Sequence, residues 1–185
     1  WKPEIEKFAP TLSAYIFHQN NRDIQEFMAS EQQVMISRYG TVRSAIDELS
    51  LINWNTVVID ESHNIKNPAA QITRAVYKLS AINRVALSGT PVMNNTFDIF
   101  SQLNFLVPGM LGGPEFFKRE YAIPIDRDMS AEKTKALQTI TAPFVLRRTK
   151  KQVAADLPEK TESVLWCQME DEQRLAYEPI KKQIK

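Results

Sequence analysis

The fold depends on one stretch, Thr56-Val57-Val58-Ile59-Asp60-Glu61-Ser62-His63. β-branched residues fill its first half, and two carboxylates, a hydroxyl and an imidazole fill its second half. A short apolar run bounded by polar residues is typical of a strand buried on both faces, as in a parallel sheet. Ligands of such sheets bind outside the carboxyl ends of the strands. Asp60 and Glu61 would project at that place.

Adjacent carboxylates at a strand end suit metal-assisted phosphate chemistry. One carboxylate can hold a magnesium ion, directly or through water, and the other can orient and deprotonate an attacking water. The alternative is a solvated Asp-Glu turn that follows a core strand and has no catalytic role. The stretch alone leaves both interpretations open.

A second stretch, Val85-Ala86-Leu87-Ser88-Gly89-Thr90-Pro91, leads from an expected strand into a turn with two hydroxyls. Small hydroxyl and glycine residues at a strand end let the backbone approach a ligand or a neighbouring side chain closely. The alternative is a loop that caps the next helix through Asn95 or Thr96. This stretch alone is also indecisive.

Strands and helices are expected to alternate through the first part of the chain. The strands are expected over residues 12–17, 34–36, 56–59 and 84–87, and the helices over 3–8, 22–28, 42–49 and 68–79. Asn20 or Asn21 would cap the second helix, and Thr41 the third. This alternation predicts parallel βαβ units and a three-layer α/β core.

The character of the sequence changes after about residue 105. A loop rich in proline and glycine covers residues 108–114, and helices are expected over 115–121 and 130–140. A strand is expected over 163–166 and a last helix over 171–184. The predicted domains are therefore an α/β lobe (1–105), a helical protrusion with a basic brace (106–160) and the start of a further connection (161–185).

Composition sets limits on the class of protein. The 185 residues suffice for one domain with a substantial core, and the net charge of +1 does not predict a polyanionic partner, so nucleic-acid contacts would need local patches. Cys167 is the only cysteine, which excludes an intrachain disulfide and a Cys-rich zinc site and fits a reducing compartment.

The expected location is inside the cell. No apolar run approaches the roughly 18 residues of a membrane span, and the start, Trp1-Lys2-Pro3-Glu4, does not resemble a signal peptide. We expect the cytoplasm or nucleoid of a prokaryote, or the nucleus of a eukaryote, and no membrane partner. Because the sequence lacks an initiator Met and stops inside an expected helix, we also expect it to be part of a longer protein.

The two stretches together are more specific than either alone. Asp-Glu-x-His after one strand and Ser-Gly-Thr-Pro after the next, separated by one helix, resemble motifs II and III of the superfamily-two helicase-like ATPases. The surrounding residues are similar to those of the Swi/Snf family of double-stranded DNA translocases. They are Trp54, His63–Pro68, Val92–Asn95, Trp1–Pro10, Phe144–Lys150, Val153, Leu157, Pro158 and Lys160.

This resemblance implies that ATP and Mg²⁺ are the cofactors. Asp60 would organise Mg²⁺ on the β- and γ-phosphates, and Glu61 would be the catalytic base for water. His63 would pass the nucleotide state to the hydroxyl turn, although a solvated turn histidine is the alternative. The residues that would couple hydrolysis to movement along DNA are Ser88, Gly89 and Thr90.

The resemblance also implies two sets of nucleic-acid contacts. Tyr39, Gly40 and Thr41 match a strand-end loop that the family uses near the DNA backbone, where amides and hydroxyls are good phosphate donors. A helix cap is an equally good interpretation of these residues. The basic run, with Arg147, Arg148, Lys150 and Lys151, would brace the two lobes or contact phosphates; its alternative is a solvated helix start.

No G-x-x-x-x-G-K-[ST] phosphate loop occurs in the sequence. The resemblance places that loop before Trp1 and the second lobe, with its arginine fingers, after Lys185. The fold class predicted is thus α/β, a partial RecA-like parallel sheet without its P-loop strand, followed by an α-helical extension. The isolated chain should bind ATP weakly and not hydrolyse it. The strand at 84–87 would be an open edge, which predicts self-association.

The predicted function is a part of an ATP-dependent double-stranded DNA translocase that remodels protein–DNA complexes without separating strands. The alternative is a DNA- or protein-docking module without ATP turnover. A third possibility, an RNA helicase, is disfavoured by the basic run before Leu157-Pro158.

Overall fold

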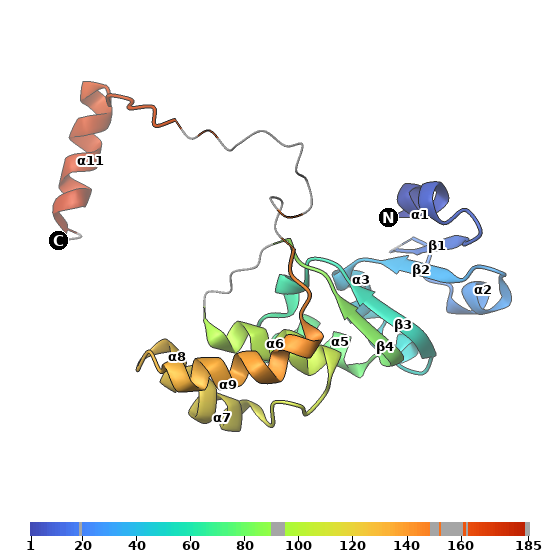
Figure 1. Ribbon diagram of the computed structural model, residues 1–185. Helices are drawn as coiled ribbons and strands as arrows, with labels where there is room; N and C mark the ends of the chain where they lie inside the picture. Colours follow the sequence, from blue (N-terminus) through green and yellow to red (C-terminus); the bar gives the residue numbers. More distant parts are fainter. Residues whose placement is uncertain (19, 90–94, 149–151, 153–160, 162, 184–185) are drawn as a thin grey trace. The chain divides into compact units, whose positions relative to one another are not determined.

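The computed structural model describes residues 1–18, 20–89, 95–148, 152, 161 and 163–183 (Figure 1). They form two compact units, Trp1–Leu146 and Arg147–Lys185. The functional boundaries expected near residues 105 and 160 stay predictions. No helix in the described residues is both long and apolar enough to cross a membrane.

The first unit contains two parallel two-stranded sheets. β1 (Ala14–Phe17) pairs with β2 (Val34–Ser37), and β3 (Asn53–Ile59) pairs with β4 (Ser80–Ala86). Parallel neighbours need a crossover connection, and α2 (Ile24–Ala29) and α5 (Gln71–Lys78) lie in these two connections. The predicted class, an α/β fold with parallel strands, is confirmed.

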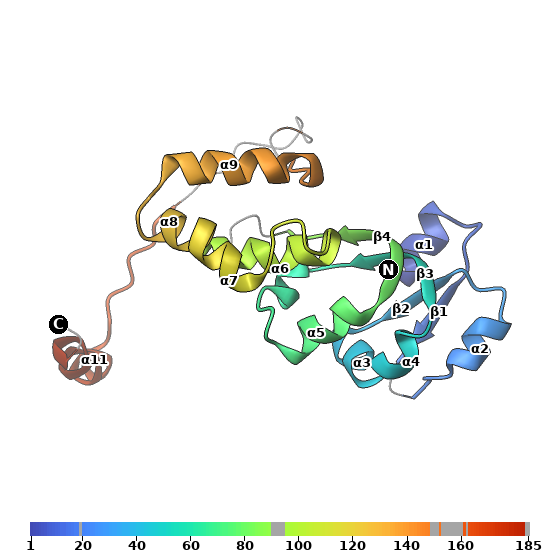
Figure 2. The ribbon, with the colours of Figure 1, turned by 90° about the horizontal axis from the view of Figure 1, so that it is seen from below.

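The remaining helices of the sheet region are short. They are α1 (Lys2–Phe8), α3 (Tyr39–Ser44), α4 (Ile46–Leu49) and the 3-10 turn η1 (Ser62–Ile65). Side chains of α2, α3, α4 and α5 build one core against the strands, and these helices lie beside the sheets in Figure 2. Phe17 and Leu49 lie at its centre and are almost fully buried, each contributing about 2 kcal/mol by leaving water.

The expected starts of three helices, α2, α3 and α5, are wrong. α2 is capped by Asp23, whose side chain accepts a hydrogen bond from the Glu26 amide at 2.8 Å, and not by Asn20 or Asn21. The amide oxygen of Asn21 instead accepts from the Tyr15 hydroxyl.

The third helix begins before its expected cap. α3 starts at Tyr39, so Thr41 lies in its first turn, buried, rather than at its N-cap. α5 starts at Gln71, three residues after the proline expected to open it, because Asn67 closes a side-chain turn onto the Ala69 amide.

The expectation that β3 is buried on both faces is wrong. Ile59 is buried against Val76 of α5 and Phe105, but Val58 is 53% exposed, and so is its β4 partner Val85, at 39%. Successive side chains of a strand point to opposite faces, and the face of Val58 and Val85 stays exposed at these two residues. In the described residues β4 pairs with β3 alone, as the expected open edge requires.

A helical extension follows the sheets. Its elements are α6 (Thr96–Leu106), α7 (Pro114–Phe117), the π-helical turn η2 (Lys118–Ala122), α8 (Ile123–Asp126), α9 (Ala131–Thr141) and η3 (Ala142–Phe144). They lie together in Figures 1 and 2 around a second core, in which the rings of Phe100 and Phe117 are 5.0 Å apart. α6 also places Phe105 in a third buried cluster, with Ile59 of β3 and Val76 of α5, so this helix joins the extension to the β3–β4 sheet.

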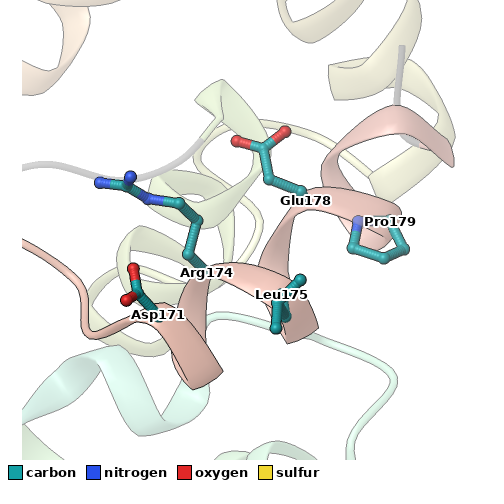
Figure 3. Close-up of a pocket in the computed structure, with 5 residues that line it drawn as sticks. All are labelled: Asp171, Arg174, Leu175, Glu178 and Pro179. Carbon is teal, nitrogen blue, oxygen red and sulfur yellow. The ribbon is translucent and has the colours of Figure 1, made fainter.

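The second unit is helical where it is regular. α11 (Asp171–Gln183) follows an extended segment in which the strand expected over 163–166 does not form. A strand needs a neighbour to pair its backbone, and Leu165 and Trp166 are 88% and 92% exposed. A shallow hollow runs along α11, and Figure 3 shows that all five side chains lining it come from this one helix. None of them is a predicted site residue.

Candidate active site

The chain segments that follow β3 and β4 meet at one end of the sheet. The Leu87 amide donates to the Ile59 carbonyl at 2.8 Å, and the Ser62 amide donates to the Leu87 carbonyl at 2.8 Å. The residues on either side of the acidic pair, Ile59 and Ser62, are therefore both hydrogen-bonded to the backbone of Leu87, the residue before Ser88. This meeting of the two stretches is the geometry that the sequence predicts.

Asp60 is exposed, but each of its oxygens has a donor. Oδ1 accepts from the Glu61 amide at 2.8 Å, and Oδ2 accepts from the indole N–H of Trp1 at 3.0 Å. The Asp60 carbonyl accepts from the Tyr39 hydroxyl at 2.7 Å. These contacts fix the carboxylate at the strand end while leaving it open to solvent.

Glu61 adopts a left-handed backbone conformation, with φ 49° and ψ 54°. For a residue other than glycine this costs on the order of 1–2 kcal/mol. Two bonds from Asn64, one from its amide and one from Nδ2, hold the Glu61 carbonyl at 2.9 Å each. Strained backbone of this kind gathers at functional sites, and here it turns the chain sharply from β3 into η1.

His63 contacts the acidic pair directly. Its Nδ1 lies 3.2 Å from Oε2 of Glu61, and the two side chains are 51% and 56% exposed. The expected relay from His63 to the hydroxyl turn stays a prediction. Ser88 and Gly89 follow β4, and Thr90 lies outside the described residues. A Cβ added at Gly89 would meet no atom within 4 Å.

The floor of the site is a buried polar contact that the sequence interpretation missed. Ser62 is 1% exposed, and its hydroxyl donates to Oε1 of Gln102 in α6 at 2.7 Å. The neighbouring Ser101 hydroxyl donates to the Ile65 carbonyl at the other end of η1. Two adjacent polar residues between the core side chains Phe100 and Leu103 were the available signal in the sequence.

Tyr39, expected near DNA, contacts the acidic segment. Its hydroxyl is the donor to the Asp60 carbonyl. Burial, and then the nearby charges of Asp60 and Glu61, raise the pKa of Tyr39 to about 12, so the phenol stays protonated. Gly40 is exposed at the start of α3, and Thr41 is buried. Of this trio, Gly40 presents the most accessible backbone.

The basic residues belong to the second unit. Arg147 and Arg148 open that unit and are exposed, while Lys150 lies outside the described residues. Their expected contacts with phosphates stay predictions.

The exposed carboxylates fit a magnesium ion of the kind that nucleotides carry. Mg²⁺ is commonly held by one or two carboxylates together with substrate phosphates and several waters. Asp60 and Glu61 supply adjacent carboxylates at one strand end, and Asp60 keeps its side chain accessible. Asp60 is the residue that would hold the ion.

Comparison with known proteins decides the family. The sequence-family model of the SNF2-related domain matches residues 1–185. This chain belongs to the SNF2-related family. The resemblance to Swi/Snf-type ATPases is thereby confirmed, and it extends over the whole sequence.

Curated relatives of this SNF2-related chain include bacterial and fungal proteins. It is 35% identical to YwqA of Bacillus subtilis over 98% of the chain, and 37% identical to the TATA-binding protein-associated factor mot1 of Schizosaccharomyces pombe over 94%. It is 35% identical over 81% to the DNA repair and recombination protein RAD26 of Saccharomyces cerevisiae. The chain spans 20%, 10% and 15% of these three relatives, respectively.

Solved structures show the same fold. The SWI2/SNF2 ATPase core of Sulfolobus solfataricus in complex with double-stranded DNA matches with a TM-score of 0.76 and 35% identity. The match covers 100% of this chain and 39% of that one. A second structure of the same core domain matches with a TM-score of 0.73. The fold is therefore part of a SWI2/SNF2 ATPase core.

Proposed function

We propose that this chain is part of an ATP-dependent translocase that moves along double-stranded DNA and remodels protein–DNA complexes. The observation that carries the proposal is the hydrogen-bonded meeting of the β3 and β4 ends, which sets an exposed acidic pair beside Ser88. The names of mot1 and RAD26, and the DNA bound to the matching ATPase core, support DNA as the partner.

In this proposal the acidic pair divides the chemistry of ATP hydrolysis. Asp60 would hold the Mg²⁺ that accompanies ATP, directly or through water, and the ion would supply positive charge beside the phosphates. Glu61 orients the attacking water and accepts its proton, and the contact of His63 with Oε2 holds the base in place. Placing the base by an existing contact lowers the cost of reaching the reactive geometry.

Movement along DNA needs residues that respond to the nucleotide and residues that grip the duplex. Ser88, Gly89 and Thr90 would carry the response, because their segment is tied to the acidic pair through Leu87. The grip on the duplex would come from the first turn of α3 and from the basic run of the second unit. These residues are Tyr39, Gly40, Thr41, Arg147, Arg148 and Lys150.

The proposed activity belongs to the full-length protein. The phosphate loop and the second lobe would come from other parts of the same polypeptide, so the isolated chain should neither hydrolyse ATP nor bind it tightly. It should also self-associate through the open edge of β4, the strand that carries the exposed Val85. A protein that uses ATP and DNA would work inside the cell, in the cytoplasm or nucleoid of a prokaryote or the nucleus of a eukaryote.

The test is the ATPase activity of the full-length protein with and without duplex DNA. We expect DNA to stimulate turnover, and Asp60→Asn to abolish it while leaving the protein folded. Exposed Asp128→Asn is the matched control and should behave as wild type. Duplex binding without ATP turnover would contradict the proposal and favour the docking module.

A further inference from the structure

Helix α6 contacts the segment that carries the proposed base. We propose that Gln102 is a positioning residue for Glu61 and acts through the hydroxyl of Ser62. This inference rests on the proposed function, because it concerns the step that Glu61 would catalyse. Gln102 would act through Ser62, whose hydroxyl donates to its Oε1.

The Ser62–Gln102 contact is buried on both sides. Ser62 is 1% exposed and Gln102 is 9% exposed, and the donor–acceptor distance is 2.7 Å. A buried hydroxyl that loses its acceptor leaves a polar group out of water without a partner, which is costly. The contact therefore defines one position of Ser62, the residue bonded directly to Glu61.

Ser62 is held from two directions at once. Its amide donates to the Leu87 carbonyl at the end of β4, and its side chain donates to α6. The preceding residue, Glu61, has a left-handed backbone, with φ 49°. Fixing Ser62 therefore maintains the strained turn at Glu61 and, with it, the direction of the carboxylate.

The other end of η1 is fastened to the same helix. The Ser101 hydroxyl donates to the Ile65 carbonyl, and the Tyr77 hydroxyl of α5 donates to the Ser101 carbonyl at 2.7 Å. Ser101 and Gln102 are consecutive, so one turn of α6 holds both ends of η1. A displacement of this turn would carry the whole segment with it.

α6 is in turn tied to the helical extension. The Asp126 carboxylate of α8 accepts from the Thr96 amide at 3.2 Å and from its hydroxyl, at the first residue of α6. Phe100 packs against Phe117 of α7 in the second core. The extension thus sets the position of α6, and Gln102 is where α6 meets the acidic segment.

The experiment replaces Gln102 in the full-length protein. In Gln102→Leu the apolar side chain cannot accept from Ser62. We expect kcat of the DNA-stimulated ATPase to fall about tenfold, because small displacements of a catalytic group are expensive, while KM for ATP is unchanged. Gln138→Leu, on the exposed face of α9, is the matched control. A folded Gln102→Leu protein with wild-type kcat would overturn the inference.

A second variant separates positioning from folding. Ser62→Ala/Gln102→Leu removes the same contact from both sides, so its kcat should be no lower than that of Gln102→Leu. If the losses of the two single variants multiply in the double variant, the two residues do not act through their contact, and the inference is wrong. If Gln102→Leu does not fold, Ser62→Ala gives the same comparison, with an expected fall in kcat of about threefold.

Hydrogen exchange gives a readout that needs no turnover. Amides 62–66 of the full-length protein should exchange about tenfold faster in Gln102→Leu than in Gln138→Leu, because local opening becomes easier. Unchanged exchange there would contradict the inference. If the two variants differ in exchange in this way but the wild-type protein has no DNA-stimulated ATPase activity, the proposed function is contradicted. The positioning of the segment by Gln102 then still holds.

Discussion

The acidic segment after β3 and the extended segment before α11 have similar sequence patterns, but only the first is held in a defined structure by other elements. Each places apolar residues next to charged ones, as in Val57–Glu61 and in Val164–Glu170. In the first, Ile59 is buried beneath α5 and α6, and the charged residues after it are held by named hydrogen bonds. In the second, Trp166 is 92% exposed and no strand forms. An apolar pattern fixes structure only where a second element covers it.

The largest difference between the two regions should be in the free energy of unfolding that is lost when an aromatic side chain is removed. Phe117 is fully buried between Phe100 and Tyr121, so Phe117→Ala should lower the free energy of unfolding by about 3–5 kcal/mol. Trp166→Ala removes a larger but exposed ring and should change it by less than about 0.5 kcal/mol. Urea unfolding of the isolated chain measures both, and equal costs would contradict the comparison.

A pair of glycines tests the backbone rather than the core. Gly112 has φ +72°, and a Cβ there would lie 2.7 Å from Cδ1 of Phe116, so Gly112→Ala should cost at least about 1 kcal/mol of unfolding free energy. Gly40 lies in α3, where a Cβ meets no atom within 4 Å. Gly40→Ala should be neutral or slightly stabilising. Thermal unfolding checks both variants: if their melting temperatures shift in the same direction, backbone conformation and space at the two glycines do not explain the effects.

Tyr39 offers a smaller, pH-dependent test at the acidic segment. Tyr39→Phe removes the hydrogen bond to the Asp60 carbonyl and should cost about 1 kcal/mol of unfolding free energy at neutral pH. The pKa of Tyr39 is raised from 10.0 to about 12, so the folded state holds this proton more tightly than the unfolded state. The contribution is complete below pH 10 and is lost as pH rises toward 12.

The control for this titration is Tyr177→Phe in α11, where the ring is 46% exposed. Unfolding free energy should fall less steeply with rising alkaline pH in Tyr39→Phe than in wild type, and Tyr177→Phe should follow wild type. Parallel curves for all three proteins would show that Tyr39 does not titrate as the geometry requires.

The smallest effect is expected at Glu120 of the helical extension. Hydrogen bonds from Arg119 and Lys133 lower the pKa of this carboxyl below its usual value of 4.5. Its folded pKa is depressed, so its contribution is present above the unfolded pKa and disappears as pH falls through the folded pKa. Glu120→Gln should flatten the acid branch of the stability curve slightly, and exposed Glu31→Gln should not. High salt should weaken the effect.

Local patterns predicted the elements better than their ends or their surroundings. The β-branched run Val57–Ile59 and the hydroxyl turn after Leu87 gave the strands and their meeting, because parallel strands of one sheet share an edge. The cap of α2 was assigned to Asn20 or Asn21 because capping residues are interchangeable in type, and only tertiary contacts decide between them and Asp23.

The contacts of the site were less predictable than its location. That Ser62 meets Gln102, forty positions along the chain, depends on how α6 packs on the sheet, and no local pattern contains that information. The exposure of Val58 could not be predicted for the same reason, because burial of a strand face depends on which elements cover it. The assignment of Tyr39 to DNA missed its bond to Asp60 because the phenol reaches the acidic segment only after both strands are in place.

The most direct test of Glu61 as the base at the meeting of β3 and β4 is single-turnover ATP hydrolysis by full-length Glu61→Gln with duplex DNA present. The hydrolysis rate should fall by about 10²–10⁴, the usual worth of a general base, while equilibrium ATP binding stays at the wild-type value. Exposed Glu31→Gln should hydrolyse ATP at the wild-type rate. A Glu61→Gln protein that also hydrolyses ATP at the wild-type rate would contradict the assignment.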